Sequence, residues 1–396
     1  MTTDTESRVR DLLAAVDPPP PRMTAADLMV TGQRTRRRRR QRQVTGVAAV
    51  AVLGIGAVTG AITASGPGAG PDAGPAGTPP RVARACAVER LDLPAGATAG
   101  EVNAGSPNGR YLAGFASGSG NAGTPVRWDG TRATAIQLAG IGEAQGVNDS
   151  GVVVGEGQAG SRQFAWAYAD GTVVELPVPD GYTGAQATGV NAAGLVSGVL
   201  FDGNRVAAAV WRGATATAPV RVLDAAGEAM AFGIADDGVV VGRLRDGSAA
   251  YRWDASGRGQ TLPLPAGAGG GAAHGVRGGW AYGLAAPDDP AVPPTASTAG
   301  PQVVDPNVAV VWHLATGEPT TVDGGRVEAI TPAGHMTVNH DGGTAAIRAP
   351  DGTELALPGV RTGGSPVAKA YAYALSDDGT QAGGSSDSVP VRWSCR

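Results

Sequence analysis

The chain is poor in the side chains that carry most enzyme chemistry. It has only two cysteines, one lysine and four histidines in 396 residues, and aromatic residues make up 5%. The two cysteines, Cys86 and Cys395, do not have paired-cysteine metal spacing, and nothing resembles a nucleophile elbow, a P-loop or a His-Glu-x-x-His helix. No local motif selects any of the histidines, which are His274, His313, His335 and His340. The sequence therefore predicts no catalytic, cofactor-binding or metal-binding residues, and favours a protein that is not an enzyme.

Glycine and proline are abundant instead, with 63 and 29 residues. Such a composition suits short strands joined by tight turns and argues against a helical architecture. A repeat supports this interpretation. Its second copy has a turn glycine, Gly151. A second glycine, Gly155, follows four residues later, and a tryptophan, Trp166, follows eleven residues after that. The next two copies have the turn glycine and the tryptophan at Gly194 and Trp211, and at Gly238 and Trp253.

Weaker copies extend the repeat in both directions. Their turn glycines and tryptophans are Gly109 with Trp128, Gly279 with Trp312, Gly334 without a tryptophan, and Gly379 with Trp393. The seven turn glycines are 42, 43, 44, 41, 55 and 45 residues apart. The sixth copy has Arg348 in the strand that should hold a tryptophan and Val338 in place of the second glycine.

Each copy reads as four short antiparallel strands. In the second copy these are residues 144–148, 152–155, 164–168 and 172–177, and Gly151 supplies the positive φ of the first turn. A period near 42 residues with four strands is the size of a propeller blade. We therefore predict an all-β, seven-bladed β-propeller over residues 86–396.

The two cysteines lie at the two ends of this run. The last copy ends at Cys395 and lacks a fourth strand, whereas residues 88–93, just after Cys86, have fourth-strand character. We predict that residues 88–93 complete the last blade and that Cys86 and Cys395 form a disulfide. Two unrelated buried thiols are the alternative.

The first 85 residues are of a different kind. Residues 44–64 carry no charge and are long enough to cross a bilayer as a helix. Seven arginines lie between positions 34 and 42, so the positive-inside rule predicts a cytoplasmic tail, residues 1–43, and an extracellular propeller. Residues 65–85 read as a Pro/Gly-rich linker. The alternative is a signal peptide cleaved near residue 64.

Two features are candidates for binding. The long fifth interval comes from an insertion over residues 285–306, which we place on the same face as Tyr182 and Trp280. A plain surface loop is the alternative. Aspartate-rich turns, as at Asp236 and Asp237, could suggest calcium, but each supplies only two or three oxygens without the spacing of a calcium loop, and Asx-turn chemistry explains them without an ion.

The repeat resembles an extracellular repeat family named for a His-Ala-Phe tripeptide, on the strength of Gly146, Asn148, Gly151, Phe164 and Trp166, although no copy has the histidine. The resemblance implies an extracellular propeller and no defined activity. The tail layout resembles single-pass anti-sigma factors of high-GC Gram-positive bacteria. Residues 1–43 hold no cysteine or histidine, so they lack the zinc motif of one subclass.

Three hypotheses for function follow. The first is a membrane-anchored module that binds or scaffolds a ligand at the cell surface. The second is a transmembrane regulator in which residues 1–43 contact a cytoplasmic partner, and the third is a propeller-based hydrolase or lyase. Taking the 10 basic and 5 acidic residues of the tail from the totals of 31 and 35 leaves 21 basic and 30 acidic residues. Nucleic acid is therefore a poor partner, and protein or neutral glycan is favoured.

Overall fold

A computed structural model describes residues 85–118, 121–203, 205–288, 307–361 and 368–396. The expected cytoplasmic tail (1–43), membrane span (44–64) and nearly all of the linker (65–85) lie outside these residues. Within the described part of the chain, no helix is long and apolar enough to cross a membrane.

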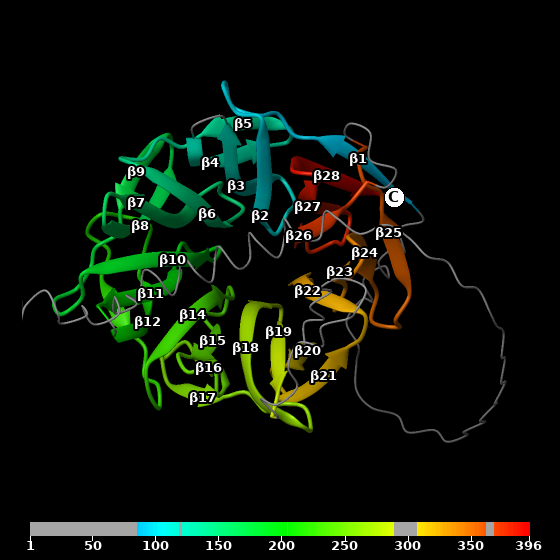
Figure 1. The fold of residues 1–396 in the computed structure, drawn as a ribbon. Coiled ribbons are helices and arrows are strands. Elements are labelled where there is room, and N and C mark those ends of the chain that lie inside the picture. Colours follow the sequence, from blue (N-terminus) through cyan, green and yellow to red (C-terminus); the bar gives the residue numbers. More distant parts are fainter. Residues whose placement is uncertain (1–84, 119–120, 204, 289–306, 362–367) are drawn as a thin grey trace, which may run out of the picture.

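In the described residues, twenty-eight strands form seven four-stranded antiparallel sheets around a central axis, as predicted (Figure 1). Blade 1 consists of β2 (Ala99–Gly105), β3 (Tyr111–Gly118), β4 (Asn121–Asp129) and β5 (Arg132–Ala135). Blade 2 consists of β6 (Ile141–Val147), β7 (Val153–Ala159), β8 (Arg162–Ala169) and β9 (Thr172–Glu175). Blade 3 consists of β10 (Gly184–Val190), β11 (Val196–Asp202), β12 (Arg205–Trp211) and β13 (Val220–Val222).

The remaining blades follow the same order. Blade 4 consists of β14 (Ala229–Ile234), β15 (Val240–Leu244), β16 (Ala250–Trp253) and β17 (Gly259–Thr261). Blade 5 consists of β18 (Ala268–Arg277), β19 (Trp280–Pro287), β20 (Val308–His313) and β21 (Glu318–Val322). Blade 6 consists of β22 (Gly325–Ile330), β23 (Met336–His340), β24 (Thr344–Arg348) and β25 (Glu354–Leu357). Blade 7 consists of β26 (Tyr371–Leu375), β27 (Gln381–Ser386), β28 (Val389–Cys395) and β1 (Cys86–Arg90).

The two ends of the propeller meet in blade 7, where β1 pairs with β28 (Figure 1). Cys86 lies directly opposite Cys395 in this pair, and the two form a disulfide across a sequence separation of 309 residues. The disulfide prediction is confirmed. The predicted closing strand, residues 88–93, was placed two to three residues too late: β1 ends at Arg90, Leu91 still bonds to Pro390 of β28, and Asp92 already bonds to Thr131 of blade 1.

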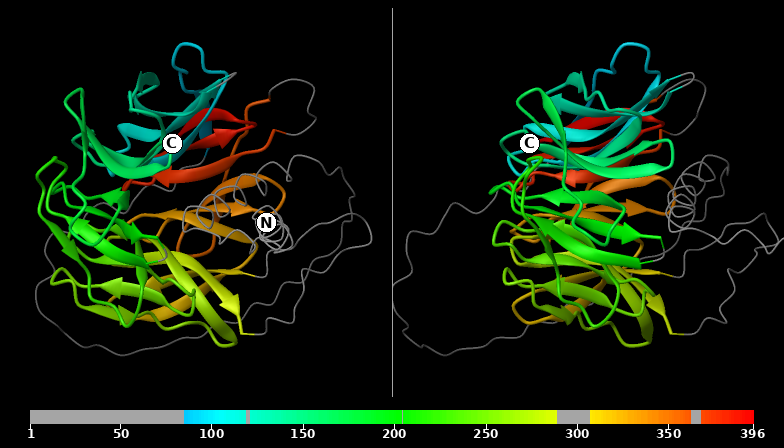
Figure 2. Two further views of the ribbon diagram at one scale, coloured as in Figure 1. Left: turned by 60° about the vertical axis from the view of Figure 1, so that its left-hand side comes forward. Right: turned by 90° about the vertical axis from the view of Figure 1, so that its left-hand side faces the viewer.

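The ring has two faces, which the side view in Figure 2 shows edge-on. We call the loop face the one that carries the blade-to-blade connections, such as residues 176–183, together with the loops between second and third strands. The turn face carries the turns between first and second strands, such as residues 148–152. Each innermost strand runs from the loop face to the turn face.

The second glycine of the repeat is explained by a β-bulge. The register shifts by one residue in the innermost strand of every blade, at the same place, as between Ala231 and Gly233 in blade 4. The bulge directs a carbonyl at the second strand, so a Cβ added at Gly242 would lie 1.8 Å from the Met230 oxygen. Six blades have glycine there, at residues 114, 155, 198, 242, 283 and 384, with the same carbonyl 1.8–2.1 Å from the added atom.

Blade 6 is the exception, with Val338 at this position. A Cβ added at Gly325, the first residue of β22, would lie 2.7 Å from the Asn339 carbonyl oxygen and 2.8 Å from the Val338 Cγ1, so the glycine leaves room for the valine.

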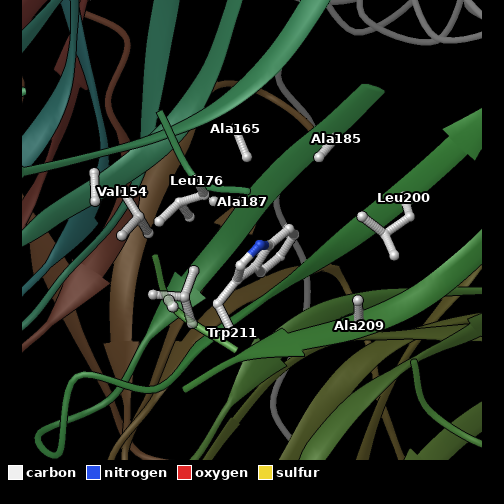
Figure 3. Packing of buried hydrophobic residues seen from close by; sticks show 11 residues of the cluster. Val154, Ala165, Leu176, Ala185, Ala187, Leu200, Ala209 and Trp211 are labelled. Atoms are coloured by element: carbon white, nitrogen blue, oxygen red, sulfur yellow. The ribbon is translucent and has the colours of Figure 1, made fainter. Parts of the chain in front are cut away.

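The repeat tryptophans tie each blade to the one before it. Trp211 is fully buried between blades 2 and 3, among residues that include Val154, Leu176 and Ala187 (Figure 3). Its indole Nε1 donates to the Pro177 carbonyl, which follows the outer strand of blade 2, at 2.8 Å. Four further tryptophans make the equivalent bond, at 2.6–2.8 Å: Trp128 to Asp92, Trp253 to Asp224, Trp312 to Pro263 and Trp393 to Pro358.

Trp166 is equally buried, but its Nε1 has no hydrogen-bond partner within the described residues. This difference makes a prediction. Replacing Trp253 by phenylalanine removes a buried donor and leaves the Asp224 carbonyl unpaired, whereas replacing Trp166 removes a donor that had no acceptor. We expect Trp253→Phe to lower the free energy of unfolding by about 1–2 kcal/mol more than Trp166→Phe. Denaturant unfolding of the full chain measures this, and equal losses would contradict the role of the indole bond.

Candidate functional site

The innermost strands surround a central cavity of about 1340 Å³. In each innermost strand one buried residue, such as Ala144 in blade 2, pairs with the second glycine of the repeat, or with Val338 in blade 6.

The residues just before these paired residues form an upper ring near the loop face: Glu101, Glu143, Gln186, Met230, Ala272, Arg326 and Tyr371. The residues just after the paired residues form a middle ring: Asn103, Gln145, Thr188, Phe232, His274, Glu328 and Tyr373. The residues three positions after the paired residues form a lower ring near the turn face: Gly105, Val147, Val190, Ile234, Val276, Ile330 and Leu375.

The three rings differ in chemistry. The middle ring consists of polar and aromatic residues and the upper ring is polar or aromatic apart from Met230 and Ala272, whereas the lower ring is aliphatic apart from Gly105. The middle ring consists of the seven residues that the bulges leave out of the register. Because a bulge redirects the side chain of its extra residue, the repeat presents one variable side chain per blade to the same level of the cavity.

Small residues keep the ring narrow just below this level. A Cβ added at Gly146 would lie 3.0 Å from the Cα of Gly189, and one at Gly233 would lie 3.1 Å from the Cα of Gly275. The innermost strands of blades 2 to 5 thus approach one another backbone to backbone. Larger residues at these positions would push the blades apart, so the close approach requires glycine.

The charges that line the cavity are unevenly distributed. Among the described lining residues, blades 1 to 3 supply three carboxylates, Glu101, Glu143 and Glu156, and no arginine or lysine. Blades 4 and 5 supply Arg243, Arg245 and Arg277 and no carboxylate. Blades 6 and 7, with the loop between them, supply both signs.

Two of the acidic side chains are direct neighbours. Glu143 on β6 lies opposite Glu156 on β7, and the Gln186 Nε2 of blade 3 donates to the Glu156 carboxylate. Carboxylates opposite each other in a strand pair destabilise it when both are charged. The cavity therefore holds a concentrated negative charge on blade 2.

The arginines are held by different contacts. Arg245 pairs with Glu228 at 2.5 Å, and Arg277 pairs with Asp377 of blade 7 at 2.7 Å on the turn-face side. Arg243 stands on β15 opposite the upper-ring residue Met230, and its Nη2 donates to the Met230 sulphur at 3.9 Å. Arg243 thus lies at the level of the upper ring, to which Arg326 of blade 6 also belongs.

Aromatic and titratable side chains meet between blades 4 and 6. The rings of Phe232 and His274 form an edge contact with centroids 6.0 Å apart. Tyr282 lies over Gly275, and burial raises the pKa of its phenol above the usual range. The charge of Glu328 raises that pKa further, while Arg277 lowers it. The phenol is therefore a neutral hydrogen-bonding group at physiological pH.

The residues predicted to define the repeat do not line the cavity. Gly151, Gly194 and Gly238 have φ between 76° and 84° and form turns on the turn face. The tryptophans Trp166, Trp211, Trp253, Trp312 and Trp393 are buried between blades. Of the four histidines, the described cavity lining includes only His274.

The proposed binding face needs one correction. Tyr182 lies on the loop face, in the connection before β10, but Trp280 begins β19 beside the turn that follows β18. It stacks edge-on against His313 at a centroid distance of 4.6 Å, near the turn face. Trp280 was placed on the wrong face. It follows the turn between the first and second strands of blade 5, which lies on the turn face, whereas the insertion follows the second strand and lies on the loop face. Most of the insertion, residues 289–306, lies outside the described part.

Sequence reasoning missed the cavity residues. The signal that could have found them is a polar or bulky residue at every second position of the strand before each turn, as in Glu143-Ala144-Gln145-Gly146. The enzyme hypothesis required carboxylates that converge on one site. Glu101, Glu143 and Glu328 line the cavity from blades 1, 2 and 6. Catalysis stays a hypothesis without a motif.

Comparisons with known proteins support the fold. A streptogramin B lyase structure matches with a TM-score of 0.53 at 12% identity, over 78% of this chain and 98% of that one. A catalytically inactive variant of virginiamycin B lyase from Staphylococcus aureus, with quinupristin, matches with a TM-score of 0.50 at 12% identity, over 78% and 99%. No family model matches the chain, and no curated protein is similar to it. At this identity the likeness shows a propeller fold alone.

Proposed function

We propose that the protein is a membrane-anchored binding module whose propeller stands outside the cell and takes its ligand in the central cavity. The observation that carries this proposal is the cavity itself, about 1340 Å³ with polar upper and middle rings above an aliphatic lower ring. Binding sites combine a concave apolar surface with a few polar groups that orient the ligand. The ligand class we favour is a protein segment or a neutral glycan.

Two further features support the cellular setting. The Cys86–Cys395 disulfide suits an oxidising compartment, where such bonds persist. The arginine-rich segment before the uncharged stretch 44–64 favours an extracellular propeller by the positive-inside rule.

Filling the cavity tests the proposal. Gln145, in the middle ring, is half-buried and lines the cavity, so Gln145→Trp would add a bulky side chain to the cavity wall at the middle ring. We would measure equilibrium dialysis of the full chain in detergent against two probes, a neutral chito-oligosaccharide and a mixed-sequence tripeptide pool. We expect the wild type to bind at least one probe and Gln145→Trp to bind it at least about tenfold more weakly, since a filled site excludes the ligand.

The matched control is Thr172→Trp, on an exposed outer-strand position of the same blade. It adds the same side chain outside the cavity, so binding should equal that of the wild type. Melting curves verify that both variants are folded. Equal binding by all three proteins, or no binding of either probe to the wild type, would contradict the cavity as the binding site.

A further inference from the structure

The middle ring is the level of the cavity at which uncharged hydrogen-bonding groups and aromatic rings occur together. Of its seven residues only Glu328 is a carboxylate, and none is an arginine or a lysine. The upper ring holds three charged residues, Glu101, Glu143 and Arg326. Each of these four charged side chains already interacts with another group of the protein. A ligand at the middle ring therefore meets mainly neutral groups.

Two amides stand side by side on one wall of this ring. The Asn103 Nδ2 of blade 1 donates to the Ala144 carbonyl of blade 2 at 3.0 Å, which holds the Asn103 amide next to Gln145. Within the described part of the chain, the half-buried Gln145 amide makes no hydrogen bond of its own. The Gln145 amide and the Asn103 oxygen thus offer a ligand both donors and acceptors.

Another wall carries an aromatic pair. The rings of Phe232 on β14 and His274 on β18 meet edge-on, with 76° between their planes. This contact uses one face of one ring at most, so each ring keeps at least one face outside the pair. Ile234, two residues after Phe232, packs in the cluster between blades 3 and 4, whereas Phe232 is half-buried and lines the cavity. The Phe232 ring is therefore an apolar surface that a ligand in the cavity can cover.

The amides and the aromatic pair face each other across the axis. In a ring of seven, each blade lies opposite the gap between the third and fourth blades from it, so blade 1 faces blades 4 and 5 (Figure 1). Asn103 of blade 1 accordingly lies across from Phe232 and His274. Blade 2 faces blades 5 and 6, which puts Gln145 across from His274 as well.

A neutral sugar has the chemistry that these two walls recognise. Its hydroxyl groups, each a donor and an acceptor, lie around the edge of the ring, and its C–H groups form two apolar faces. Amides bond to the hydroxyls, and an aromatic ring covers a C–H face. The cavity volume of about 1340 Å³ exceeds the roughly 300–1,000 Å³ of most small-ligand sites, so more than one sugar ring has room.

We propose that the middle ring binds a neutral oligosaccharide, with sugar hydroxyls at Gln145 and Asn103 and the C–H face of a sugar ring on Phe232. This inference rests on the proposed function and narrows its ligand class from a protein segment or neutral glycan to the glycan.

Equilibrium dialysis of the full chain tests the ligand class, in a detergent whose headgroup contains no sugar and so cannot compete. The probes are the neutral chito-oligosaccharide, a malto-oligosaccharide and the mixed-sequence tripeptide pool. We expect at least one oligosaccharide to bind at least about tenfold more tightly than the peptides, which lack a ring with hydroxyls at its edge.

Variants of the aromatic wall test the stacking contact. Phe232→Leu keeps an apolar side chain but loses the flat ring, and should weaken oligosaccharide binding at least about fivefold. Phe232→Tyr keeps the ring and should bind within about twofold of the wild type. The tyrosine variant separates stacking from a general effect on packing.

Variants of the amide wall test the hydrogen bonds. Gln145→Leu removes the amide at similar size and should weaken oligosaccharide binding at least about fivefold. The matched control is Gln137→Leu, in the exposed connection between blades 1 and 2, and it should leave binding unchanged. Melting curves verify that the variants are folded, and if Phe232→Leu does not fold, Gln145→Leu decides alone.

Oligosaccharide binding that the folded Phe232→Leu and Gln145→Leu variants weaken supports the inference. Oligosaccharide binding that either folded variant leaves at the wild-type level overturns it, as does equal or tighter binding of the peptides. Both of these outcomes leave the binding module standing. Binding of no probe overturns the inference and the proposed function together.

Discussion

The double variant Cys86→Ser, Cys395→Ser is expected to melt about 10 °C below the wild type. The disulfide joins residues 309 positions apart, so its loss restores a large loop entropy to the unfolded chain, about 5 kcal/mol in the loop-closure estimate. For a domain of this size about 2 °C of melting temperature corresponds to 1 kcal/mol. Without the bridge, the pairing of β1 with β28 and the packing of blade 1 against blade 7 still hold the ring closed.

Differential scanning calorimetry of the full chain measures this shift. Replacing both cysteines avoids a lone reactive thiol, and the wild type melted in reductant should give the same value. A shift below about 2 °C in both experiments would show that the strand pairing closes the ring by itself.

Gly242→Ala is expected to destabilise the propeller by at least about 3 kcal/mol. The added Cβ would lie 1.8 Å from the Met230 carbonyl oxygen and 2.9 Å from its carbon, so backbone must move. Relief requires opening the bulge, which also displaces Phe232 at the middle ring. Overpacking against backbone costs more than overpacking against a side chain that can rotate.

Gly227→Ala is the matched control, because a Cβ there meets nothing within 4 Å and its backbone is not in the left-handed region. This change should be neutral or stabilising by up to about 1 kcal/mol, through the unfolded chain. Chemical unfolding of the two variants compares them directly. Similar stabilities would mean that glycine occurs at this position of the repeat for a reason other than the bulge.

The blade count was predictable because six of the seven blades have a glycine at the bulge and six have a buried tryptophan on the third strand. Gly242 receives the bulge carbonyl and Trp253 bonds to the preceding blade, so both recur at a fixed spacing. The cysteine pairing was predictable because ring closure puts the two ends in one sheet. The start of β1 was not predictable, because Cys86 pairs as a strand residue although it lies outside the repeat pattern.

The cavity was not predictable in the same way. Its residues differ from blade to blade, as Gln145, Phe232 and Glu328 do, so no motif marks them. What brings them together is the bulge, which becomes visible only in the strand register. The face of Trp280 was misjudged for a related reason, because its side of the sheet depends on which turn it follows.

The most direct test of the account uses intact cells that produce the wild type, Gln145→Trp or Thr172→Trp, incubated with a labelled neutral oligosaccharide that does not cross the membrane. If the propeller faces outward and its cavity is open, cells that produce the wild type or Thr172→Trp should carry surface label. Cells that produce Gln145→Trp should carry no more label than cells without the protein. Equal label on all three, or label only after the cells are permeabilised, would contradict it.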